Sequence, residues 1–170
     1  MVFLDTEFHQ SARGLWLLSV GMVGPTSEFY AELDAPGLFL IPGLAKNDFV
    51  QGEVLSQFGL ISGAQVSQLE MSNRAVRWLN DQGADDVLEI VYDFSADFSL
   101  LENLLNLACV KVNARLEAVH VGYLLEDPDG TAAAQAAWFS MMGRAGVGRH
   151  HALGDAVALR ARFEAVHMRP

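Results

Sequence analysis

VFLDTEFHQSARGLWLLSVGMVGPTSEFYAELD, residues 2–34, contains three strand-like segments in immediate succession. Residues 2–5 and 15–23 are apolar runs typical of buried strands. The turn-forming residues 24–27 then separate the second run from an alternating segment, 28–34. The stretch therefore predicts consecutive strands at the start of the chain, the last two of them joined as a hairpin.

Helical and strand patterns alternate over the rest of the chain. The patterns predict helices at roughly 46–58, 67–80, 95–108, 131–143 and 151–167, strands at 87–94 and within 115–123, and a loop at 35–45. Ser95 is the expected N-cap of its helix. This order predicts an α/β fold, a mixed central β-sheet flanked by α-helices. With 170 residues and no repeat or linker, we expect a single domain, 1–170.

Composition narrows the classes of protein to consider. Half of the residues are hydrophobic, which is typical of a globular chain. The single cysteine, Cys109, excludes an intramolecular disulfide and fits a reducing compartment. The start of the chain lacks the pattern of a signal peptide, and its longest early apolar run is too short for a transmembrane helix. We therefore expect a cytoplasmic protein with no membrane association.

Charge is distributed unevenly along the chain. The net charge is −10, yet residues 144–170 contain five arginines against Asp155 and Glu164. These arginines belong either to a solvated helix or to a region of positive charge around a phosphate-bearing substrate. Among them we take Arg149 as the candidate substrate-binding residue. The rest of the chain, before residue 144, is acidic and would repel the phosphates of a long DNA duplex. We therefore favour a short or single-stranded substrate held at one end.

Four carboxylates occur where predicted elements begin or end. Asp5 and Glu7 are two residues apart at the end of the first strand, so they share one face, while Asp97 and Asp155 each open a helix. Open sheets place their ligand sites at such ends. Carboxylates suit Mg²⁺ or Mn²⁺, and two such ions about 4 Å apart can activate a water and stabilise a leaving oxygen. A nearby histidine could accept the proton of the water.

The segments VFLDTEF, ADFSLL and HHALGDA resemble the three motifs of the DEDDh 3′–5′ exonucleases, from residue 2 to about 160. The short chain and its DTEF start are most similar to compact bacterial exoribonucleases of the ribonuclease T and ribonuclease AS type. The resemblance implies a ribonuclease H-like fold and a metal-dependent 3′–5′ exoribonuclease that releases 5′-mononucleotides from single-stranded RNA 3′ ends. Relatives of this size are commonly homodimers, so we expect a homodimer.

Position by position, the resemblance implies roles for particular residues. The four carboxylates that it assigns both to catalysis and to two divalent cations, Mg²⁺ or Mn²⁺, are Asp5, Glu7, Asp97 and Asp155. His150, five residues before Asp155, corresponds to the general base of the family. His151 falls at a variable position, and we expect an exposed histidine at the start of the helix.

The second motif departs from the family pattern. Asp93 stands where the family often has histidine or asparagine. Asp97 precedes paired leucines in the family manner and is the preferred ligand, with Asp93 beside it; Asp93 as the ligand is the alternative. Phe8 is either a stacking surface for the terminal base or a core residue of the sheet. Four residues at helical spacing are expected in the core or at a dimer contact: Trp138, Phe139, Met141 and Met142.

Two other functions are compatible with the same residues. One is a non-cleaving module that binds nucleotides or RNA ends, although such a module has no need of four carboxylates and a histidine together. The other is a 3′–5′ exodeoxyribonuclease, which the acidic balance of the chain disfavours.

Overall fold

A mixed six-stranded β-sheet forms the centre of the molecule. Residues 1–83 and 86–167 are described by a computed structural model. Its strands are β1 (Val2–Ser11), β2 (Gly14–Val23), β3 (Glu28–Leu33), β4 (Gln65–Val66), β5 (Val87–Tyr92) and β6 (Arg115–His120). The strand order is β4-β3-β2-β1-β5-β6, in which β1, β2 and β3 are antiparallel and the other neighbours are parallel. The predicted α/β class with a mixed sheet is confirmed.

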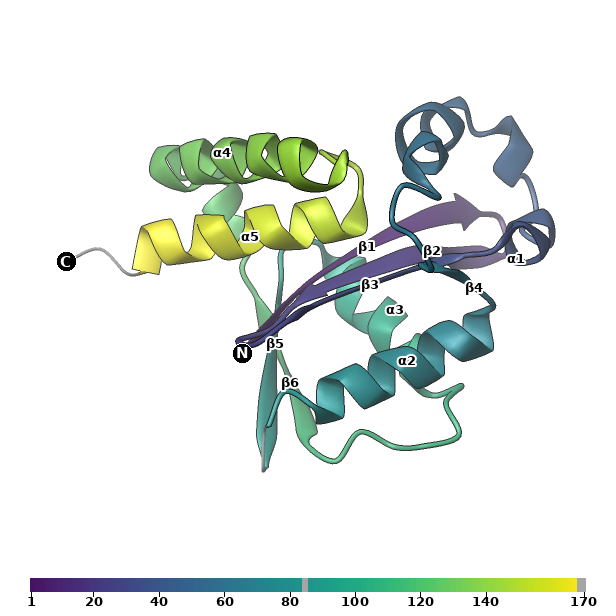
Figure 1. The fold of residues 1–170 in the computed structure, drawn as a ribbon, viewed down its shortest axis with the longest axis horizontal. Helices are drawn as coiled ribbons and strands as arrows, with labels where there is room; N and C mark the ends of the chain where they lie inside the picture. Colours follow the sequence, from purple (N-terminus) through teal and green to yellow (C-terminus); the bar gives the residue numbers. More distant parts are fainter. Residues whose placement is uncertain (84–85, 168–170) are drawn as a thin grey trace.

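Helices cover both faces of this sheet (Figure 1). They are α1 (Ala35–Phe39), α2 (Gln68–Asn80), α3 (Ser95–Leu105), α4 (Pro128–Ala145) and α5 (Ala152–His167). α2 and α3 lie on one face, and α4 and α5 on the other. Each face has its own apolar core, one around Leu4, Met22 and Leu101 and the other around Phe3, Val91 and Leu159.

Two segments differ from their predicted secondary structure. Residues 35–45 contain α1, which begins because the Asp34 carboxylate accepts a hydrogen bond from the Gly37 N–H at 2.9 Å. Residues 46–58 are not one helix but a π-turn, Val50–Val54, followed by a 3₁₀-turn, Leu55–Gln57. A glycine inside this segment lowers its helix propensity, so tertiary contacts decide the shape of the backbone.

Strand boundaries and one cap also differ. β1 extends to Ser11 because it is paired with β2 from Phe3 to Ser11. Several residues in its second half are polar, so a hydrophobicity pattern does not reveal this part of the strand. The sequence does not predict β4, because a strand of two residues is too short to show an alternation of apolar and polar residues. The N-cap of α3 is Phe94 rather than Ser95.

Within the described residues, no helix has the length and apolar character needed to cross a membrane. Arg169 lies outside the described residues.

Candidate functional site

The strands β1 and β5 separate next to the predicted carboxylates. Their parallel pairing consists of Val2 with Ile90 and Phe3 with Val91, after which β1 continues while the chain turns from β5 into α3. Asp5 and Glu7 therefore lie inside β1, not at its end, which corrects the predicted position. The gap beside them is a place where residues from the end of β5 can approach β1.

The start of α5 packs directly on the sheet above Asp5. Gly21 on β2 is the cross-strand partner of Asp5. A Cβ atom on Gly21 would lie 2.3 Å from the backbone of Ala152, so only glycine permits this approach of the helix. Asp155, in the first turn of α5, is thereby brought over the carboxylates of β1.

Asp97 reaches the same place from the opposite face of the sheet. It lies in the first turn of α3 and is only 1% exposed. Its Oδ1 accepts a hydrogen bond from the Thr6 hydroxyl at 2.6 Å. Its Oδ2 is buried and has no hydrogen-bond partner among the residues that the structure describes. Burying a hydrogen-bond acceptor without a partner destabilises the folded protein. A ligand that bound this oxygen would remove that destabilisation.

The predicted residues form two adjacent groups of possible metal ligands. Donor atoms of Glu7, His150 and Asp155 all lie within 4.8 Å of one another. Donor atoms of Asp5, Asp93 and Asp97 do so as well. The fold thus brings all four predicted carboxylates and His150 together, and it adds Asp93 to them.

Burial and mutual repulsion make these carboxylates hard to ionise. Desolvation raises the pKa of Asp5 well above its usual value, and the neighbouring carboxylates raise it further. Desolvation, followed by the charges of Asp155 and Asp97, raises the pKa of Glu7 to about 8. Burial is also the main reason that the pKa of Asp97 rises to about 7 and that of Asp155 to about 6. Divalent cations would remove this repulsion, so the residues fit Mg²⁺ or Mn²⁺.

Trp138 orients Asp155, a role that the sequence did not reveal. The indole N–H donates to Oδ1 of Asp155 at 2.6 Å, and the backbone N–H of His150 donates to Oδ2 at 2.9 Å. Both carboxylate oxygens are therefore fixed in direction. The residues at helical spacing with Trp138 differ in burial. Met141 is in the core, whereas Phe139 is 83% exposed.

The backbone of His150 has an uncommon conformation. Its φ is 62°, in the left-handed region that non-glycine residues rarely adopt. Gln57 holds this loop, because its side-chain amide donates to the carbonyls of Arg149 at 2.8 Å and His150 at 3.1 Å. Desolvation and the nearby Arg149 lower the pKa of the His150 imidazole. The ring is therefore neutral at pH 7 and able to accept a proton.

His151 contradicts the expectation of an exposed side chain. It is 2% exposed, and its ring stacks on Tyr30 with centroids 4.2 Å apart. The cause is the close approach of α5 to the sheet, which turns the first residue before the helix inward. Desolvation lowers the pKa of this imidazole to about 4, so it is uncharged.

Aromatic and basic side chains surround the carboxylates. Phe8 packs partly against the core and stacks on Phe94, with ring centroids 5.7 Å apart. Phe94 is 54% exposed and so presents an open aromatic face. The guanidinium of Arg149 lies 5.5 Å from the centre of the Trp138 ring. Phe8 thus belongs to the sheet core and to an aromatic pair beside the site.

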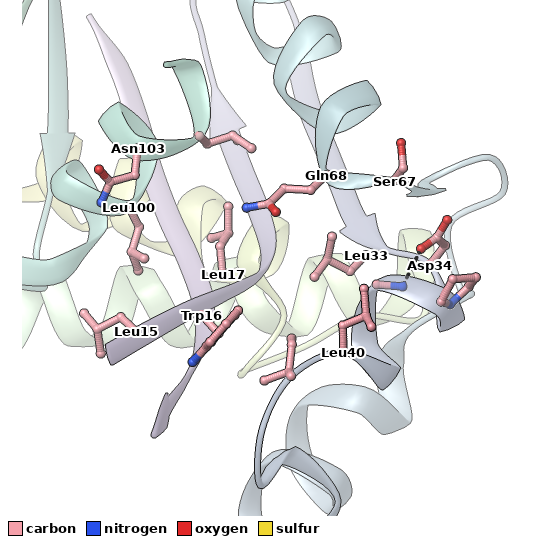
Figure 2. A pocket seen from close by; sticks show the side chains of 14 residues that line it. Leu15, Trp16, Leu17, Leu33, Asp34, Leu40, Ser67, Gln68, Leu100 and Asn103 are labelled. Carbon is pink, nitrogen blue, oxygen red and sulfur yellow. Dashed lines mark hydrogen bonds between the residues drawn. The ribbon is translucent and has the colours of Figure 1, made fainter. Parts of the chain in front are cut away.

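Two cavities could be considered as ligand sites. One, of about 310 Å³, is lined by Asp5, Asp93, Phe94, Leu125, Trp138, Arg149, His150, Asp155, Ala158, Leu159 and Arg162. A larger one, of about 530 Å³, lies among Trp16, Leu40 and Leu100 (Figure 2). Asp34 is the one charged residue among those described that line the larger cavity, and its carboxylate caps α1. We place the candidate site in the smaller cavity, where titratable groups with shifted pKa values converge.

Comparison of the chain with protein-family models gave no match, and comparison with curated proteins gave none either. Function must therefore be inferred from the chemistry of the side chains in the site.

Proposed function

We propose that the protein is a metal-dependent 3′–5′ exoribonuclease that releases 5′-mononucleotides from single-stranded RNA. The observation that carries the proposal is the clustering of donor atoms in two groups, one of Glu7, His150 and Asp155 and one of Asp5, Asp93 and Asp97. Asp5, His150 and Asp155 from these groups line one cavity. The strand order β3-β2-β1-β5-β6, with β4 beside β3, is compatible with a ribonuclease H-like fold. The motif resemblance supplies the direction of attack.

The four carboxylates would hold two Mg²⁺ or Mn²⁺ ions. The unpartnered Oδ2 of Asp97 and the raised pKa values of its neighbours support this assignment. When bound, the ions would supply activation of the attacking water and stabilisation of the leaving oxygen. Trp138 and the His150 backbone would keep the Asp155 carboxylate in one orientation.

His150 would accept a proton from the attacking water. Its lowered pKa leaves the imidazole neutral at pH 7, and Gln57 fixes the backbone that presents it. The Phe8–Phe94 pair offers a surface on which the terminal base could stack, and Arg149 could contact a substrate phosphate. A cavity of about 310 Å³ is small for a nucleic-acid site and suits one terminal nucleotide rather than a duplex.

The proposal includes a cytoplasmic homodimer, on the strength of the resemblance. Phe139 and Met142, 83% and 56% exposed, lie three residues apart on α4. Residues at this spacing share a helix face, and exposed apolar groups of this kind support association.

The direct test uses RNA and DNA oligomers of one sequence, labelled at the 5′ or the 3′ end. With Mg²⁺ or Mn²⁺, 5′-labelled RNA should shorten stepwise and 3′-labelled RNA should release labelled mononucleotide at once. EDTA, or the substitution Asp155→Asn, should slow this reaction at least about 100-fold. Asp86→Asn, an exposed position before β5, is the matched control and should retain the wild-type rate.

Other outcomes would favour the competing functions. Faster shortening of DNA would indicate an exodeoxyribonuclease. Binding of RNA without cleavage under any metal condition would indicate a non-cleaving module. Internal fragments would contradict attack at the 3′ end.

A further inference from the structure

Asp93 is the fifth carboxylate in the cluster of possible metal ligands. It directly follows β5, and its donor atoms lie near those of Asp5 and Asp97. Unlike them, it has a cationic partner, because NH1 of Arg162 donates to its Oδ2 at 3.2 Å. The pair is shielded from solvent, with 20% of the Asp93 side chain and 8% of the Arg162 side chain exposed.

The fold makes specific room for Arg162. This residue lies on α5, seven positions after Asp155, and lines the same cavity. A Cβ atom on Gly130 of α4 would lie 2.7 Å from the Arg162 Cγ, so the glycine admits the arginine stem. The Nε atom of Arg162 is buried and unpartnered within residues 1–83 and 86–167. A guanidinium is costly to bury, and one carboxylate compensates only part of that cost.

The charges of the cluster divide into two sets. The ion pairs of the described residues include Arg162 with Asp93, but none with Asp5, Glu7, Asp97 or Asp155. Two divalent cations would balance those four negative charges. Arg162 balances the fifth negative charge, which is that of Asp93, so no metal ion is required to neutralise this carboxylate.

We propose that Arg162 is a positioning residue that neutralises Asp93 and keeps this carboxylate from binding the ions at Asp5 and Asp97. The inference rests on the proposed function, since it concerns the same metal site. It assigns Asp97 as the ligand and Asp93 as a carboxylate bound to the protein's own cation.

The test is the affinity for Mn²⁺ of the full chain, stripped of metal and titrated by calorimetry at low ionic strength. Arg162→Met should bind Mn²⁺ about tenfold more tightly, because it exposes the ions to an uncompensated negative charge. Asp93→Asn should bind about tenfold more weakly, because an unpaired guanidinium remains, with two ions still bound per chain. The double variant should return to within about threefold of the wild type, as both charges are gone.

Two further variants keep the test decisive. Arg160→Met removes the same charge from the same helix, where it pairs with Glu164 near solvent, and should leave Mn²⁺ affinity unchanged. Arg162→Lys keeps the charge and should stay within about threefold of the wild type. If Arg162→Met does not fold, the Arg162→Lys and double variants decide.

Three results would overturn the inference. They are weaker binding by Arg162→Met, loss of one bound ion in Asp93→Asn, and a double variant as weak as Asp93→Asn. If the wild type hydrolyses RNA with Mn²⁺ and a variant gives any of these results, the role of Arg162 alone is refuted. Wild-type protein that binds no Mn²⁺ refutes the proposed function and this inference together.

Discussion

Replacing Glu7 by glutamine should have opposite effects on stability with and without metal. The pKa of Glu7 rises from 4.5 to about 8 in the folded chain, so folding becomes costlier as pH increases between these values. At about 1.4 kcal/mol per pH unit, the cost has an upper bound of about 5 kcal/mol. Since neighbouring carboxyl groups take up protons in place of Glu7, we expect about 2 kcal/mol at pH 8.

The metal-free Glu7→Gln variant should therefore be more stable than the wild type at pH 8, and the gain should shrink towards pH 5. About 2 kcal/mol corresponds to a rise in melting temperature of roughly 4–8 °C for a chain of this size. With millimolar Mn²⁺ the order should reverse, because the wild type gains the free energy of ion binding and the variant has lost a ligand.

The measurement is thermal unfolding in EDTA and in Mn²⁺, from pH 5 to pH 8.5. Glu89→Gln, an exposed position on β5, serves as the control and should melt with the wild type throughout. A metal-free Glu7→Gln protein that melts below the wild type at pH 8 would refute the reasoning. So would equal stabilisation of both proteins by Mn²⁺.

Further predictions concern the two histidines and the tryptophan. His150→Ala should slow RNA hydrolysis by about 10²–10⁴-fold, and the variant should keep most of the stability of the wild type. A decrease in rate of less than tenfold would exclude His150 as the base. His151→Ala should lower the free energy of unfolding by about 2–4 kcal/mol, because it leaves a cavity against Tyr30; denaturant titration would show an unchanged midpoint if this packing were unimportant. Trp138→Phe removes the indole donor to Asp155 and should cost about 10–100-fold in turnover or Mn²⁺ affinity, with neither changed if the bond is incidental.

Local patterns in the sequence predicted much of the fold. The strands at 87–94 and 15–23 and the helices at 67–80 and 151–167 were located to within a few residues, because their apolar residues recur at the period of the element. The same patterns placed Asp97 and Asp155 at helix starts. They failed at residues 46–58, where backbone shape depends on contacts with distant parts of the chain.

The chemical groups of the site could be read from the amino-acid sequence. They are four carboxylates and a histidine, in an order that resembles a known family. The partners of those groups depend on how the chain folds. Arg162 and Asp93 are 69 positions apart, and Thr6 and Asp97 are 91 apart, so no local period connects them. His151 became a core residue because Gly21, on another strand, lets α5 touch the sheet. The recurrence of apolar residues along the sequence indicates which side chains are buried. The charge state of a buried group depends on its neighbours in space, which are brought close only when the chain folds.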